Sequence, residues 1–236
     1  MFPLKNGSRG KTVRVLQYGL GLTTDGIFGP NTAKGLKAWQ KKMSIPQTGR
    51  MTETIWNTIF QFEIQDMKHL KFAELFKSIR EEDVDMDGTP DNRSEIIDVM
   101  IKSVWEWWEP EDNKAGPPWC AIFISYCLYA AYSFPFESPR VKEWYEYLKD
   151  HEDALELKSK DDFKKDRIYI GGYLNEQGYG HVFFVNPMKS LSQTGEKIIA
   201  TIEGNTNEGG SREGNGVYER QRKLEKYWVY SIPADI

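Results

Sequence analysis

The chain has 236 residues and a mass of 27.4 kDa, which fits one or two domains and excludes a single small module. Hydrophobic residues make up 39% of the chain, enough for a packed core, which excludes a disordered or collagen-like protein. The net charge of -4 is unevenly distributed, because residues 1–60 hold nine Lys or Arg against two acidic residues. This segment has a net charge of +7, which leaves -11 for the remainder. The asymmetry predicts two units, of which the basic one suits an anionic polymer.

The sequence predicts no membrane-spanning helix, no Sec signal and no disulfide. No run of about 18 apolar residues occurs, so no membrane-spanning helix is predicted. The first ten residues lack an apolar segment and a small-residue cleavage site, so we expect no Sec signal and synthesis in a cytosol. The chain's two cysteines, Cys120 and Cys127, lie on one predicted helix, about 10 Å apart along its axis, too far for a disulfide.

The first 60 residues contain an internal repeat with an offset of 23 positions. Val13, Leu16, Gln17 and Leu20 align with Leu36, Trp39, Gln40 and Met43, and Asp25-Gly26 aligns with Thr48-Gly49. Apolar residues at helical spacing predict one buried stripe per copy, and the glycines suit a turn. Each copy is therefore predicted to be a helix followed by a turn, and a third apolar segment, 54–60, completes an all-α three-helix bundle.

These residues resemble the peptidoglycan-binding type 1 domain, a small three-helix cell-wall module. The resemblance covers residues 4–60 and is carried by Gly7 to Gly10, Val13, Leu16-Gln17, Asp25 to Gly29, Thr32, Trp39-Gln40, Thr48-Gly49 and Thr54 to Trp56. It implies that bacterial peptidoglycan is the partner. Spacing alone leaves open a generic helical bundle whose repeat only packs a core.

Residues 61–82 form an amphipathic pattern without Pro or Gly, which predicts a connecting helix that docks into the second domain. His69 has no other candidate catalytic group nearby, so we interpret it as a surface or boundary histidine. Four acidic residues follow: Asp83, Asp85, Asp87 and Asp91. The first three resemble the opening of an EF-hand calcium loop, but Ser94 stands where that loop has a bidentate Glu. Both a structural calcium site and a solvated acidic turn fit this pattern.

Cys120 follows Pro117-Pro118-Trp119 and opens an apolar run of helical length. The prolines stop the incoming chain, so Cys120 is predicted in the first turn of a buried helix. Unpaired backbone N–H groups and the helix dipole favour a thiolate there. This position suits a nucleophile; the alternative, a small buried hydrophobe, is our interpretation of Cys127.

A cysteine nucleophile needs a base, and the chain has three histidines: His69, His151 and His181. His151 lies in a charged stretch that we interpret as a solvated face. His181 begins a predicted strand, with its side chain on the face of Phe183. The next predicted strand ends in Glu203-Gly204-Asn205, whose two polar side chains share one face if the extended conformation continues. Either side chain can orient an imidazole.

The order Cys, His, then Glu or Asn is papain-like. The surrounding motifs resemble the CHAP family of cysteine, histidine-dependent amidohydrolases and peptidases, most closely its phage-type members. These motifs are Pro118 to Leu128, Gly180 to Val185, Ile202 to Thr206, Asp91 to Arg93, Arg140 to Trp144 and Gly209 to Val217. The resemblance covers most of residues 80–225 and departs from the family at Arg167 to Ile170, where Gly-Asp usually precedes the apolar residues.

The resemblance implies an α+β papain-like domain with an antiparallel sheet. Its catalytic residues would be Cys120 as nucleophile, His181 as base and then acid, Glu203 as the orienting group and Asn205 as a second polar contact. The Cys120 backbone N–H is the expected oxyanion donor. Trp119 and Tyr173 are candidates for the lining of a substrate groove, although Trp119 alternatively only packs at the helix entry.

We therefore expect a peptidoglycan-binding domain at 1–60, a connecting helix at 61–82 and a CHAP-like cysteine amidase or peptidase domain at 83–236. The expected function is that of an endolysin, a hydrolase of N-acetylmuramoyl-L-alanine amidase type. Alternatives are a stem or cross-bridge endopeptidase and a non-catalytic wall-binding or phage structural protein.

We expect no required cofactor, with a structural calcium at the acidic segment as one of the two open alternatives, and we expect a monomer and no membrane partner. Nucleic acid is not expected either, because Trp105, Trp107 and Trp108 lie among acidic residues that repel phosphate. Wall-active chemistry without a Sec signal fits a phage endolysin that accumulates in the host cytoplasm and reaches the wall by holin-type release or other export.

Overall fold

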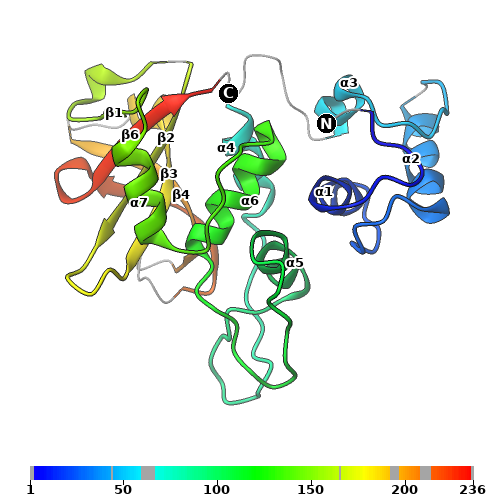
Figure 1. Cartoon of the computed structure of the whole chain (residues 1–236), viewed down its shortest axis with the longest axis horizontal. Coiled ribbons are helices and arrows are strands. Elements are labelled where there is room, and N and C mark those ends of the chain that lie inside the picture. Colours follow the sequence, from blue (N-terminus) through cyan, green and yellow to red (C-terminus); the bar gives the residue numbers. More distant parts are fainter. Residues whose placement is uncertain are drawn as a thin grey trace. The chain divides into compact units, whose positions relative to one another are not determined.

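The structure, a computed structural model, describes residues 3–43, 45–59, 67–164, 166–191, 197–207 and 214–234. The chain divides into two compact units, Met1–Lys71 and Phe72–Ile236 (Figure 1), which we call the N-terminal unit and the C-terminal unit. Within the described ranges, every helix is too short or too polar to cross a bilayer.

Within residues 3–43 and 45–59, the N-terminal unit has three helices: α1 (Lys11–Gly19), α2 (Pro30–Lys42) and α3 (Glu53–Ile59) (Figure 1). Their apolar stripes and the turns between them supply a buried core of Val13, Leu16, Phe28, Leu36, Met51 and Trp56. The predicted three-helix arrangement is confirmed. Phe60, the last residue of the predicted third segment, lies outside the described residues.

The internal repeat has a structural counterpart, a buried glutamine that fastens each glycine turn to the preceding helix. Gln17 accepts a hydrogen bond from the Gly26 N–H and donates one to the carbonyl of the next residue. Gln40 makes the same two bonds with Gly49 and the residue after it. Gly26 and Gly49 have φ angles of 73° and 64°, which L side chains rarely adopt. Both copies of the 23-position repeat therefore share the hydrogen bonds between the glutamine and the turn as well as the packing of the helix.

The segment predicted as a connecting helix contains α4 (Lys68–Leu75). Residues 60–66 lie outside the described part of the chain. The helix ends at Leu75 because the N–H groups of Phe76 and Lys77 bond to carbonyls three residues back, which tightens the last turn. His69, interpreted above as a surface or boundary residue, is instead buried, because it lies on the same face of α4 as the buried Phe72. Burial lowers the pKa of His69 to about 3.

An antiparallel sheet of six strands forms the centre of the C-terminal unit, in the order β1-β6-β2-β3-β4-β5. The strands are β1 (Leu155–Glu156), β2 (Arg167–Leu174), β3 (Gly180–Asn186), β4 (Ile198–Thr206), β5 (Gly216–Lys223) and β6 (Trp228–Pro233). The expected antiparallel sheet with helices is confirmed. The strand at which the sequence departs from the CHAP pattern is β2, between β3 and β6.

Helices cover this sheet, and the start of α6 lies near the first residues of β3 and the last residues of β4. α6 (Cys120–Tyr132) packs on β3 and β4, and α5 (Glu95–Val104) packs on α6 (Figure 1). α7 (Val141–Asp150) packs on β2, β3 and β6, and the short α8 (Pro187–Leu191) packs on β4. Phe123 of α6 contacts Phe184 of β3, whereas Phe183 belongs to a separate buried cluster on the other face of the sheet.

Candidate active site

Cys120 is the first residue of α6, as predicted. It is only 3% exposed and its thiol is free. No side chain caps this helix N-terminus, so its first N–H groups have no capping acceptor. Burial alone would raise the pKa of the Cys120 thiol, but the hydrogen bond and charge of His181 and the backbone N–H groups of Val182 and Ala121 outweigh it. The pKa of Cys120 is therefore lowered. Burial raises the pKa of Cys127 well above its usual value.

His181 is the second residue of β3 and is 1% exposed. Its Nε2 lies 2.9 Å from Oε2 of Glu203. The other ring nitrogen, Nδ1, is buried and makes no aligned hydrogen bond within the described chain, so the interaction with Cys120 falls to Nδ1. Burial works to lower the pKa of His181, but Cys120 and Glu203 outweigh it and raise this pKa to about 9.

Glu203 lies near the end of β4 and is fully buried. Its carboxylate contacts His181, accepts a hydrogen bond from the Thr201 hydroxyl, and receives two from Arg222 of β5. Burial works to raise the pKa of Glu203, but Arg222 and then His181 outweigh it and lower this pKa to about 2. Glu203 is therefore an ionised partner of the imidazole.

The extended conformation does not continue through Asn205, so the condition for a face shared with Glu203 is not met. The pairing of β4 with β5 shifts register between Glu203 and Thr206, and Asn205 has a φ of 53°, which breaks the alternation of side chains. When the side-chain amide is oriented so that its oxygen and its nitrogen are both hydrogen-bonded, the oxygen accepts from the backbone N–H of Trp119 at 3.2 Å. The nitrogen then donates to Glu81 at 3.2 Å. Asn205 therefore contacts the entry to α6, and Glu203 contacts the imidazole.

Trp119 is fully buried, so the expectation that it lines a substrate groove is wrong. Its Nε1 donates to Glu81 at 2.8 Å, and its ring packs edge-on against Phe123. It packs at the helix entry, the second of the two alternatives. Tyr173 is half-buried and pairs with His181 across β2 and β3, which places both side chains on one face of the sheet.

Three residues with contacts to this site were not predicted: Arg222, Glu81 and Thr201, which donates to Glu203. Arg222 donates two hydrogen bonds to Glu203, and Glu81 accepts hydrogen bonds from Trp119 and Asn205. Counting in steps of two from the buried Val217 leads to Glu219, Gln221 and Lys223, which are exposed, so strand periodicity does not indicate Arg222. Glu81 carries no signal either, because its partners lie far along the chain.

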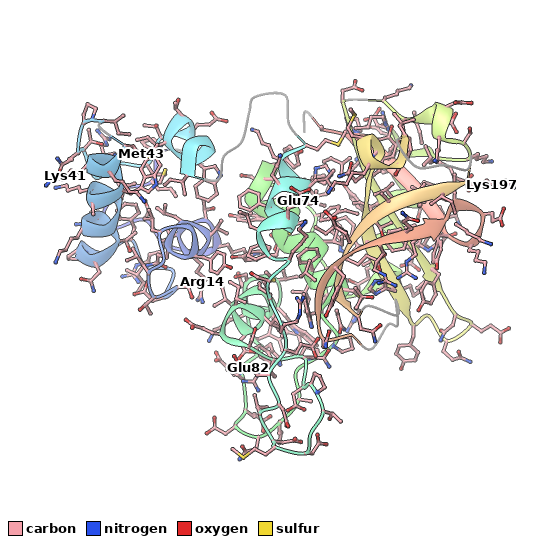
Figure 2. All side chains as sticks on the ribbon, turned by 180° about the vertical axis from the view of Figure 1, so that it is seen from behind. Arg14, Lys41, Met43, Glu74, Glu82 and Lys197 are labelled. Atoms are coloured by element: carbon pink, nitrogen blue, oxygen red, sulfur yellow. The ribbon has the colours of Figure 1, made fainter. Side chains whose placement is uncertain are left out.

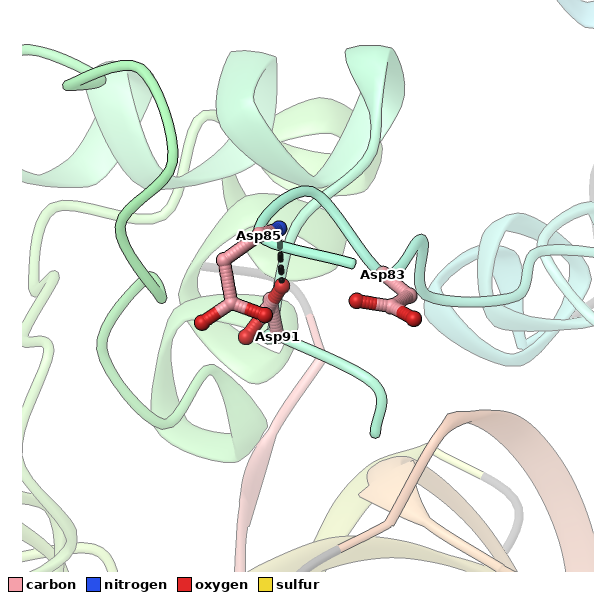
Figure 3. Close-up of side chains that lie close together, drawn as sticks. All are labelled: Asp83, Asp85 and Asp91. Carbon is pink, nitrogen blue, oxygen red and sulfur yellow. Dashed lines mark hydrogen bonds between the residues drawn. The ribbon is translucent and has the colours of Figure 1, made fainter. Parts of the chain in front are cut away.

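The acidic segment before α5 brings together three of the four predicted calcium ligands. One carboxylate oxygen each of Asp83, Asp85 and Asp91 lies within 4.8 Å of the others (Figure 3). The carboxylate of Asp87 instead accepts hydrogen bonds from Thr89. Figure 3 also shows the Asp85 N–H donating to Asp91, at 3.2 Å.

The electrostatics of this cluster suit a hard cation. The hydrogen bond from Asp87 N–H lowers the pKa of Asp85, but desolvation and the charges of Asp87, Asp91 and Asp83 outweigh it, so this pKa is raised. Three carboxylates that repel one another are ligands that calcium accepts. Ser94 is no ligand, because its hydroxyl caps α5 by accepting from the Ile97 N–H.

A pocket of about 580 Å³ lies in the N-terminal unit, at the first repeat's turn and the start of α2. Its apolar lining includes Leu22, Ile27 and Pro30, and its polar lining includes Asn31 and Lys34. A mixed lining of this kind suits a ligand with both apolar and polar groups.

Residues 13–59 match the family model described as "Putative peptidoglycan binding domain". The N-terminal unit carries a peptidoglycan-binding domain. No curated protein and no solved structure matches the chain.

The peptidoglycan-binding domain is also the basic part of the chain. Lys41 is exposed at the C-terminal end of α2, next to Met43, which is 44% exposed (Figure 2). Met43 is the second-copy counterpart of Leu20, so the stripe of the second helix ends in solvent. Exposed lysines on this domain suit an anionic wall polymer.

Proposed function

We propose that the protein is a peptidoglycan hydrolase whose C-terminal unit cuts an amide bond with the Cys120 thiolate. The observation that carries this proposal is the buried array of Cys120, His181 and Glu203 at a helix N-terminus, in one chain with a peptidoglycan-binding domain. The array is papain-like in its order, and its motifs resemble the CHAP family.

The proposed reaction begins when the Cys120 thiolate attacks the carbonyl carbon of the scissile amide. The backbone N–H groups at the start of α6 stabilise the oxyanion that forms. His181, protonated beside the thiolate, donates its proton to the departing amine, which leaves a thioester on Cys120. A water molecule then attacks the thioester with His181 as its base, and the carboxylic acid product and the free thiol are released.

Glu203 has an electrostatic part in this cycle. Its hydrogen bond to Nε2 fixes the imidazole so that Nδ1 faces the sulfur, and its negative charge stabilises the imidazolium. Asn205 acts on the helix entry through Trp119 and does not touch the imidazole. Tyr173, beside His181, is the residue that lines the substrate groove in this proposal.

We assign wall attachment to the pocket that includes Leu22 and Lys34, because its mixed lining suits a peptide stem with carboxylates. The bond that we propose is that between N-acetylmuramic acid and L-alanine, with a stem or cross-bridge peptide bond as the alternative. The biological context that we propose is a phage-type endolysin released to the wall by a holin or another export route.

Product analysis tests the proposal and separates the two bonds. Purified peptidoglycan is digested with the wild-type protein, and new amino termini are identified by mass spectrometry. New N-terminal L-alanine supports the amidase, and a new amino terminus elsewhere in the stem or bridge supports the endopeptidase. Intact peptidoglycan after prolonged incubation with folded protein would contradict both.

A further inference from the structure

We propose that Arg222 is a positioning residue of this site, which holds the Glu203 carboxylate in place for His181 and keeps it charged throughout the cycle. The catalytic consequence of this inference rests on the proposed function. The electrostatic consequence does not, because the side chains concerned are already in contact.

The contact between Arg222 and Glu203 is two-pronged. Nε of the guanidinium donates to Oε1 at 2.9 Å, and Nη2 donates to Oε2 at 2.6 Å. The Glu203 side chain is fully buried and that of Arg222 is 13% exposed. Paired hydrogen bonds between charged groups in a site that excludes water fix the orientation of the carboxylate as well as its position. Oε2, which Arg222 holds, is the oxygen that contacts His181.

The guanidinium also contacts two aromatic residues. Its carbon lies 5.8 Å from the centre of the Phe183 ring and 5.5 Å from that of Tyr227. Nη1 donates to the Tyr227 hydroxyl at 3.3 Å. Contacts with two aromatic rings therefore restrict the position of the Arg222 side chain, in addition to its hydrogen bonds to Glu203.

A buried carboxylate needs such a partner because His181 changes its charge during the proposed reaction. While the imidazole is protonated, it compensates Glu203, but after it gives its proton to the leaving amine it does not. Burying an uncompensated carboxylate is costly, so without a second cation Glu203 would tend to take up a proton. Arginine does not lose its proton in proteins, so Arg222 compensates Glu203 in both states.

The charged and titratable groups around this contact come from each neighbouring element. They are Cys120 of α6, His181 of β3, Glu203 of β4, Arg222 of β5 and Tyr227 before β6. Removal of the positive charge of Arg222 raises the proton affinity of every other group in this set. A residue that only packed the fold would change stability without moving the titration of His181.

The test is a pH titration of the histidine imidazole ¹⁵N signals by NMR, in which a His181→Gln spectrum assigns His181. In Arg222→Gln we expect the titration of His181 to move upward by about one pH unit. The matched control is Lys223→Gln, which removes the same charge from the neighbouring, exposed position of β5 and should leave His181 at its wild-type value. An unchanged His181 titration in folded Arg222→Gln would overturn the inference.

Arg222→Lys is the second variant, in case Arg222→Gln does not fold. It keeps the charge but lacks the fork, so the His181 titration should stay near the wild-type value while kcat on peptidoglycan falls at least about tenfold with KM unchanged. Wild-type kcat in this variant would overturn the positioning role. If the wild-type protein does not cut peptidoglycan, the proposed function fails, whereas the NMR titration still decides the inference about Arg222.

Discussion

Truncation of the buried Gln17 to Ala should strongly destabilise the peptidoglycan-binding domain, although the side chain is polar. Gln17 is 2% exposed; its oxygen accepts from the Gly26 N–H at 2.8 Å. Its amide nitrogen lies within bonding distance of Asp25, the Ile27 carbonyl and Thr32, at 2.6, 3.1 and 2.9 Å. An amide nitrogen has two hydrogens, so at most three of these four contacts are hydrogen bonds at the same time.

The expected cost follows from these bonds. Two neutral hydrogen bonds contribute about 1 kcal/mol each, and the one to the Asp25 carboxylate about 2 kcal/mol, so Gln17→Ala should cost about 4 kcal/mol. Gln40 makes its equivalent bonds to Thr48 and not to a carboxylate, so Gln40→Ala should cost about 3 kcal/mol. A domain of this size is stable by only about 3–9 kcal/mol, so either loss is a large fraction.

Hydrogen exchange of the full chain, followed by mass spectrometry, measures this loss locally. In Gln17→Ala, amides of α1 and α2 should exchange about a thousandfold faster than in wild type, with α6 unaffected. Gln47→Ala is the matched control, because Gln47 is exposed in the same domain. Equal protection in Gln17→Ala and Gln47→Ala would refute the view that the repeated glutamine fastens the turn.

Three further predictions follow from the charges of the molecule. Replacement of Glu203 by Gln removes an anion that raises the pKa of His181, so the alkaline limb of the pH–rate profile should move from about 9 toward the usual 6.5; an unmoved limb would exclude this role. Calcium should raise the melting temperature by relieving repulsion among the clustered carboxylates, and the increment should vanish in Asp85→Asn or with chelator; equal melting with calcium and with chelator would exclude the site. Binding of full-length Cys120→Ala to purified walls should weaken as salt rises, because the binding domain is basic and salt screens its charges. Salt-independent binding would instead assign recognition to contacts in the pocket.

The placement of Cys120 and His181 followed from local signals. Two prolines before an apolar run set the start of α6 at Cys120, and the strand pattern set His181 at the start of β3. The choice between Glu203 and Asn205 did not follow. It depends on a register shift in the pairing of β4 with β5, which no local sequence pattern indicates. Local patterns predict the element on which a residue lies, whereas long-range pairing decides where its side chain points.

Arg222 was missed for a related reason. Its strand carries a run of charged residues that is typical of a solvated edge, yet one of these residues turns inward to a buried carboxylate. The acidic segment behaved similarly, since Asp83, Asp85 and Asp91 gather while Asp87 bonds to its own turn. For the acidic segment the sequence predicted the residues and only some of their side-chain partners, whereas for Arg222 it made no prediction.

The most direct measurement is the rate at which purified peptidoglycan releases new amino groups in the presence of three proteins: wild type, Cys120→Ala and Cys127→Ala. The two cysteines share one helix, but only Cys120 has a lowered pKa and a histidine partner. We predict release by wild type and by Cys127→Ala, and none above background by Cys120→Ala. Release by Cys120→Ala at the wild-type rate would contradict the proposed cysteine mechanism.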